Sequence, residues 1–181
     1  MRNEMKTFLI PQGTESIRQY NLLNGVRPSR LLFAVCPPQA LTGTSYQNNP
    51  IYFPGAKYKI NYVDFYVNEE SVLPMPYQPD FANNDYCYSY LGFLKTLRLL
   101  NKSNPICPLD YDTFKNIFTV FGVDLSADAS NLTIANDGNV NVSIQVRFKE
   151  NLPTAATGLL IAEYRSCVYI DHNNNVVQRD M

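Results

Sequence analysis

The clearest hydrophobic pattern in the chain is a two-residue alternation along residues 61–68. Successive side chains of a strand point to opposite faces of a sheet, so this pattern predicts a strand with one apolar face. The acidic pair at 69–70 interrupts it, and Ser71–Leu73 is the expected hairpin partner. Prolines between 74 and 79 cannot donate to a strand ladder, so pairing should stop there. The pattern places Asn61, Val63, Phe65 and Val67 on the apolar face, and Tyr62, Asp64, Tyr66 and Asn68 on the other.

A second alternation runs along residues 140–149, with apolar side chains at the even positions and polar ones at the odd positions. This half-solvated pattern is typical of antiparallel sheet. A tight-turn signal precedes it at 136–138, because Asn, Asp and Gly tolerate positive φ. Residues 117–123 are apolar on both faces, which predicts an inner strand, and 158–170 is predicted as one long final strand. The residues expected to face the core are Val140, Val142, Ile144, Val146 and Phe148.

The rest of the chain predicts shorter elements. Ser29–Val35 is expected to be a buried strand, and Thr7–Pro11 an extended junction strand or arm. Gly13–Asn24 is predicted as a polar connection, and residues 41–50 as an exposed loop. One helix is expected over 85–100, with Asn84 as its cap and a turn-rich break after it. Its apolar stripe consists of Tyr86, Tyr90, Phe93, Leu97 and Leu100.

Many short strands separated by turn signals predict an all-β fold. We expect an antiparallel two-sheet jelly-roll sandwich with one inserted α-helix at about residues 85–100. A chain of 181 residues suits one domain, with residues 1–24 as a junction or arm segment that leads into it. A domain of this size buries about 70% of its unfolded surface, so it needs neither a disulfide nor a metal to hold it together.

Candidate catalytic residues are few. The single histidine, His172, lies in an Asn-rich turn beside Asp171, and neighbouring residues on a strand point apart. The chain has no Gly-x-Ser-x-Gly elbow, no His-Glu-x-x-His and no phosphate-binding glycine loop. Acid–base catalysis needs two carboxyl groups that converge in a pocket. The pairs at 69–70 and at Asp110 with Asp112 are instead expected to be solvated turn charges. We predict no enzyme activity and no catalytic residue.

Metal and cofactor sites are not predicted either. Zinc sites use clustered Cys and His. The four cysteines of this chain include no closely spaced pair, and the chain has a single histidine. Residues 124–128 could offer oxygen ligands, yet they lack the full spaced set of a calcium loop and are predicted as a turn. The sequons at Asn101, Asn131 and Asn141 are expected to be unglycosylated, since several arise by chance in an Asn-rich chain and Asn141 lies in a predicted strand. The cysteines, expected to be free and mostly buried, are Cys36, Cys87, Cys107 and Cys167.

Composition narrows the class of partner. The 15 Lys and Arg are scattered and balanced by 16 Asp and Glu, which argues against a nucleic-acid footprint. The charged fraction of 17% is below the roughly 25% of ordinary globular domains. The 13 Tyr and 10 Phe indicate either surfaces covered by neighbouring subunits or an interior rich in aromatic residues. No stretch reaches the roughly 18 apolar residues of a membrane span, and we find no secretion signal.

A set of short segments, none of them specific alone, occurs in one order from about Thr7 to the C-terminus. In the order of these segments, the chain resembles the second jelly roll of the major capsid proteins of Polinton (Maverick) elements and the related adintoviruses. The segments at the centre of the resemblance are Asn49-Pro50-Ile51-Tyr52-Phe53, Ile60-Asn61, Tyr66-Val67, Gln78-Pro79-Asp80-Phe81 and Tyr86-Cys87-Tyr88-Ser89-Tyr90-Leu91. Those before and after it are Arg27-Pro28-Ser29-Arg30-Leu31-Leu32, Val123-Asp124-Leu125-Ser126, Asn139-Val140, Leu152-Pro153 and Ile170-Asp171-His172-Asn173.

The resemblance implies a structural protein of the virion. Two jelly rolls stand side by side in each chain, three chains make a trimeric capsomer, and capsomers tile an icosahedral shell inside the host cell. The partners would be other jelly rolls of the same capsid protein and neighbouring capsomers. Met1 would then lie near the domain junction, although a single-domain relative is the alternative. The alternative function is a single jelly-roll binding module that recognises carbohydrate or protein through its loops.

Overall fold

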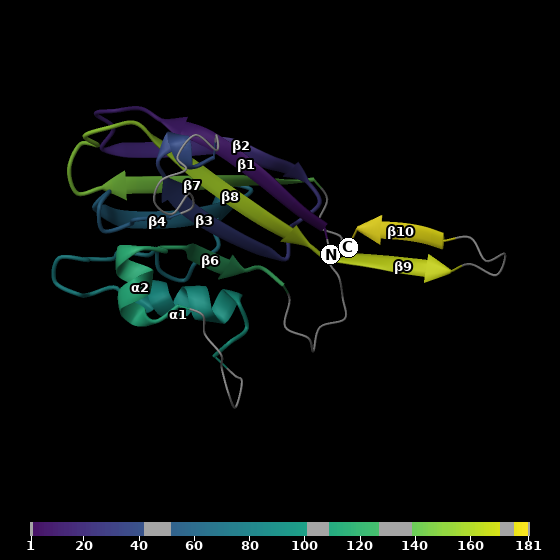
Figure 1. The fold of residues 1–181 in the computed structure, drawn as a ribbon. Coiled ribbons are helices and arrows are strands. Elements are labelled where there is room, and N and C mark those ends of the chain that lie inside the picture. Colours follow the sequence, from purple (N-terminus) through teal and green to yellow (C-terminus); the bar gives the residue numbers. More distant parts are fainter. Residues whose placement is uncertain (1, 42–51, 101–108, 127–138, 171–175, 181) are drawn as a thin grey trace.

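The computed structural model describes residues 2–41, 52–100, 109–126, 139–170 and 176–180 of the chain, and it is a sandwich of two antiparallel four-stranded sheets (Figure 1). The first sheet has the order β1 (Arg2–Ile10), β8 (Ala156–Tyr164), β3 (Arg30–Cys36) and β6 (Phe121–Asp124). The second has the order β2 (Ser16–Gly25), β7 (Val140–Phe148), β4 (Ile60–Val67) and β5 (Glu70–Ser71).

The strand pairing is nested, which is the topology of a jelly roll. β1 pairs with β8, β2 with β7, β3 with β6 and β4 with β5, all antiparallel. The chain therefore runs as one long folded hairpin, and this hairpin wraps into two sheets through the further pairs β3·β8 and β4·β7. The predicted antiparallel jelly-roll sandwich is confirmed.

The core lies between the two sheets and is built from the alternating positions that the sequence indicates. The two central strands of the second sheet, β4 and β7, contribute side chains that are fully buried in one cluster with those of β3 and β8. This confirms the core facing predicted for both alternations except at Asn61. Ser143, which the second alternation predicts to face water, is only 1% exposed. The members that the sequence places in a shared core are Val63, Phe65, Val142, Ile144 and Val146, all 0% exposed.

The first alternation differs from its prediction at two residues. The register between β4 and β7 shifts between Ile60 and Tyr62, so Ile60 takes the core position and Asn61 is exposed. Asp64 lies on the polar face as predicted but is 2% exposed, and the Ser71 hydroxyl of β5 donates a 2.8 Å hydrogen bond to its carboxylate. The hairpin is confirmed, but its second strand is Glu70–Ser71 and not the predicted Ser71–Leu73. Both turn residues, Asn68 and Glu69, have positive φ, as in the two-residue turns that suit twisted strands.

Helices cover one edge of the sandwich, beside β6 (Figure 1). The predicted helix is real but shorter, α1 (Cys87–Thr96), and Asn84 does not cap it, since Tyr86 occupies the cap position without a side-chain bond. The structure adds a second helix, α2 (Tyr111–Asn116), and a 3-10 turn, η1 (Pro38–Ala40). The sequence missed α2 because six residues are too short to show a helical period.

Two glycines let the helical layer approach the sandwich closely. A Cβ added at Gly92 of α1 would lie 2.1 Å from the hydroxyl oxygen of Tyr77, and one at Gly122 of β6 would lie 2.6 Å from Oγ1 of Thr96. The Tyr77 hydroxyl in turn donates a 2.6 Å hydrogen bond to the carbonyl of Gly122. In the apolar stripe of the helix, Tyr86 and Phe93 are buried, whereas Leu100 is exposed.

Four other sequence predictions need correction. Residues 16–25 form strand β2 and not a polar connection. Of the two alternatives for Thr7–Pro11, an extended strand is correct and an arm is wrong, because β1 pairs with β8 along its whole length. β6 is an outer strand that begins only at Phe121. The residues before it follow the end of α2 at Asn116, and among them Phe118 makes only an isolated bridge with Phe53. The predicted strand 158–170 is two strands, β8 and β9 (Ser166–Ile170), and β9 pairs separately with β10 (Val176–Asp180). That hairpin extends beyond the sandwich (Figure 1).

Candidate functional site

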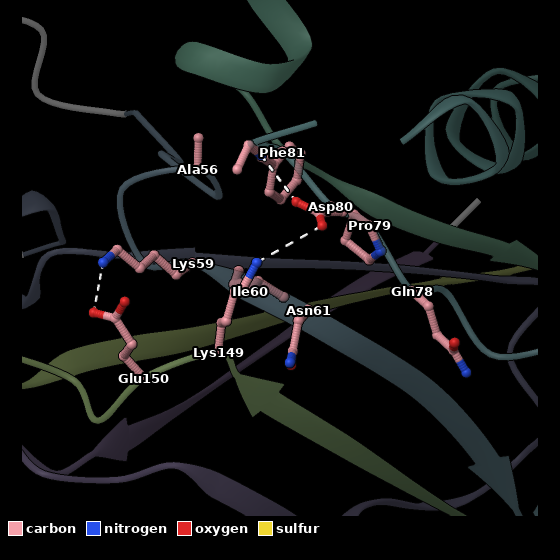
Figure 2. Close-up of a pocket in the computed structure, with 11 residues that line it drawn as sticks. Ala56, Lys59, Ile60, Asn61, Gln78, Pro79, Asp80, Phe81, Lys149 and Glu150 are labelled. Carbon is pink, nitrogen blue, oxygen red and sulfur yellow. Dashed lines mark hydrogen bonds and ion pairs between the residues drawn. The ribbon is translucent and has the colours of Figure 1, made fainter. Parts of the chain in front are cut away.

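One pocket opens at an end of the sandwich, between segments that are far apart in the sequence (Figure 2). The loop before β4, the turn at residues 78–82 and the end of β7 form its walls, and its volume is about 510 Å³. The polar side chains of the lining come from Lys59, Asn61, Gln78, Asp80, Lys149 and Glu150.

The charged groups of this pocket neutralise one another in pairs. Nζ of Lys59 lies 2.5 Å from a carboxylate oxygen of Glu150, and Nζ of Lys149 lies 3.7 Å from one of Asp80 (Figure 2). Hydrogen bonds from Asn83, first from its backbone N–H, hold the pKa of Asp80 below its ordinary value, and Lys149 acts in the same direction. Asp80 therefore stays ionised at neutral pH, which suits the binding of polar groups better than proton transfer.

The outer face of the second sheet is rich in tyrosine and arginine. The guanidinium of Arg18 stacks 4.2 Å from the ring centre of Tyr66, and that of Arg147 stacks 4.5 Å from Tyr62. The Tyr66 hydroxyl donates to Gln145 over 3.1 Å, and burial raises its pKa well above the ordinary range. Tyr and Arg are enriched at protein interfaces, so the composition of this face favours contact with another protein.

The outer face of the first sheet carries one apolar row between two rows that include polar residues. The row on one side contains Asn3, Glu163 and Arg30, and the row on the other side contains Thr7 with Leu159 and Ala34. β-sheet pairing aligns Met5 of β1 with Ile161 of β8, and Ile161 with Leu32 of β3, in one row across the sheet. The next row contains Leu159 and Ala34, which are buried although they lie outside the core cluster. The sequence did not reveal this face, because apolar residues on both sides of β3 and β8 look the same as those of a strand buried in the core.

The carboxylates that the sequence singled out do not converge. Glu69 and Glu70 are exposed in the β4–β5 hairpin. Asp110 caps α2 by accepting a 2.6 Å bond from the backbone N–H of Thr113, and Asp112 lies in the first turn of that helix. Asp124 accepts a bond from the backbone N–H of Ser126, as expected for a turn.

The structure places several of the other residues that the sequence singled out. Among the four cysteines, Cys36 is a buried and Cys87 an exposed free thiol. Of the sequons, Asn141 lies in β7 as predicted. Within the part of the chain that the structure describes, no group of three or more His, Cys, Asp or Glu could hold a metal ion. The described helices include none with the length and apolar composition of a membrane span. Asn101, Cys107, Asp128, Asn131 and His172 lie outside the described residues, and so does the tight turn at 136–138.

No protein-family model, curated protein or solved structure matches this chain.

Proposed function

We propose that this chain is a structural protein, the C-terminal jelly roll of a double jelly-roll major capsid protein of the Polinton and adintovirus type. Three such proteins would form a capsomer, and capsomers would tile an icosahedral shell in the virion. The ordered resemblance supports the family, and the nested strand pairing supports it at the level of the fold. Jelly rolls serve several functions, so the fold alone does not distinguish a capsid protein from a binding module. The residues on the surface of the sheets are what favour one function over the other.

The observation that carries the proposal is the apolar row on the outer face of the sheet β1-β8-β3-β6, together with the exposed Leu9 of β1. Met5 and Leu9 are 61% and 62% exposed, and Met5 continues across the sheet into Ile161 and Leu32. Burial of apolar surface is favourable by about 25 cal/mol per Å², so such a row gains stability when another domain covers it. A shell protein provides that cover through its companion jelly roll and its neighbours.

The second candidate is a binding module that recognises a polar ligand through its loops. The pocket in Figure 2 favours it, because Asn61 and Gln78 line the same pocket as the two ion pairs. This lining would suit a carbohydrate or a polar peptide. The apolar row has no role in this alternative, and for that reason we rank it second.

Negative-stain electron microscopy of the complete gene product that carries this chain tests the proposal, with trimeric capsomers or shells as the expected result. Leu9→Lys should abolish these assemblies and leave the fold intact, because the side chain is exposed in the single domain. Met75→Lys is the matched control, since Met75 is 55% exposed outside that sheet. A gene product that stays monomeric and binds a glycan array would replace the capsid proposal with the binding module.

A further inference from the structure

β1 is an outer strand, and no described strand pairs with one of its two edges. It pairs with β8 on one side and is the last strand of its sheet on the other. An open edge presents a row of backbone N–H and C=O groups on which another strand can be added. Natural proteins often block such edges with charges, and β1 carries Glu4 and Lys6. The arrangement of these two charges decides whether the edge is blocked or complementary to a partner.

The charges of β1 are complementary to a second copy of the same strand. In an antiparallel pair related by a two-fold axis through Met5, Glu4 faces Lys6 of the second copy, and Lys6 faces Glu4. Opposite charges at facing positions stabilise a strand pair, and like charges destabilise it. An axis through Glu4 would oppose two glutamates, and an axis through Lys6 would oppose two lysines. An axis through Asn3 would oppose Glu4 and Arg2, which are also of opposite sign, but it would leave Lys6 and the rest of the strand unpaired.

The same register also brings the exposed apolar residue of the edge to the centre of the contact. Met5 would face Met5 of the second copy, and the row Leu32–Ile161–Met5 would continue into the matching row of that copy. In the single chain, Glu4 is half-buried and lies 3.1 Å from Lys6 and 3.4 Å from Arg2 on its own strand. Ion pairs near the surface contribute little to stability, so the pair with Lys6 can exchange for the facing pair.

We propose that β1 forms a two-fold contact with β1 of a second copy, centred on Met5, which joins two four-stranded sheets into one continuous sheet. The contact would give the proposed shell a two-fold link between capsomers, and in that use it rests on the proposed function. The pairing itself depends only on the edge strand, so it can be tested on this chain alone.

Charge variants test the register. Glu4→Lys places lysine at both positions and Lys6→Glu places glutamate at both, so like charges face one another in either variant alone. We expect each to dimerise at least tenfold more weakly than the parent chain in sedimentation equilibrium at low salt, where surface charges are least screened. An equimolar mixture of the two should dimerise again, because every facing pair is then of opposite sign. Near-identical thermal midpoints would show that the fold is unchanged.

Cysteine cross-linking tests the centre of the contact. Met5→Cys faces itself in this register and should form a disulfide-linked dimer under mild oxidation. Leu9→Cys is the matched control, since Leu9 is equally exposed on the same side of β1 but faces residue 1 of the second copy. The parent chain gives the background from its own four cysteines.

Three results would overturn the proposal: a parent chain that stays monomeric at its highest soluble concentration, a mixture of charge variants that stays monomeric, or equal cross-linking at positions 5 and 9. The β1 contact and the capsid function can fail independently of one another.

If the gene product forms capsomers but Met5→Cys gives no cross-link, the β1 contact is wrong and the capsid function stands. If Met5→Cys cross-links but the gene product forms no capsomers, the β1 contact stands and the capsid function is wrong.

Discussion

A lysine in place of Ile144 tests how the central strand β7 is oriented between the two sheets. Ile144 is 0% exposed and lies between Phe65 of β4 and Gln19 of β2. An unpaired charge buried at such a site costs about 3–5 kcal/mol, against a total of about 5–15 kcal/mol for a typical domain. For a chain of this length, 1 kcal/mol corresponds to about 2–4 °C, so we expect the thermal midpoint to fall by about 6 °C or more.

The neighbouring residue gives the matched control. Gln145 points to the outer face, where it accepts a hydrogen bond from the Tyr66 hydroxyl and faces Arg18 across the strands. Gln145→Lys loses that bond, worth about 1 kcal/mol. The new positive charge lies between Arg18, which repels it at a cost of up to about 1 kcal/mol, and Asp64 of β4, which attracts it. The lysine ammonium can still reach water, so the total should stay below about 2 kcal/mol.

Urea unfolding followed by circular dichroism measures both changes, because the midpoint reports stability when the slope is unchanged. Ile144→Val calibrates the loss of one methylene group, about 0.5–1.5 kcal/mol. If Ile144→Lys unfolded within about 1 kcal/mol of the parent chain, or if Gln145→Lys cost as much as Ile144→Lys, our assignment of the two faces of β7 would be wrong.

Three further predictions concern the helical layer and metal dependence. Gly92→Ala should lower stability by about 1–3 kcal/mol in the same urea assay, since the new Cβ would displace the Tyr77 hydroxyl, whereas Tyr77→Phe should cost about 1 kcal/mol for the lost bond to Gly122. Hydrogen bonding by Thr113, first by its side chain and then by its backbone N–H, lowers the pKa of Asp110 below its ordinary 3.8. The stabilisation by the cap is therefore present above that pH and lost as the pH falls through the folded-state pKa. The urea midpoint of Asp110→Ala should accordingly lie below that of the parent at pH 7 and approach it in acid, while Asp110→Asn, which keeps a capping oxygen, should show less pH dependence. A chelator should leave the thermal midpoint unchanged, and a drop of more than a few degrees would reveal a metal site outside the described residues.

The sequence by itself determined the elements whose evidence is local. The alternation around Phe65 and Ile144 fixes which side chains face the core, because burial of one face is a property of each strand alone. The hairpin after Val67 and the helix near residues 87–96 likewise follow from turn residues and from a short apolar period. These segments needed no knowledge of their partners in the folded chain.

Tertiary structure decided the elements whose character depends on neighbours. Residues 16–25 look polar because β2 is an outer strand with a register shift between Gln19 and Leu23, which disrupts any alternation. Residues 117–123 look like an inner strand, but α1 covers the outer strand β6 and buries its second face. In both cases burial comes from packing and not from the strand itself.

The candidate surfaces depended on the fold most of all. Lys59 and Glu150 are 91 positions apart in the chain, and only the pairing of β4 with β7 brings them to one pocket. The apolar row from Met5 to Leu32 likewise crosses three strands that are distant in sequence. The sequence supplied these side chains, but the nested pairing of the strands decided that they form a surface, because contacts between distant segments leave no periodic signal along the chain.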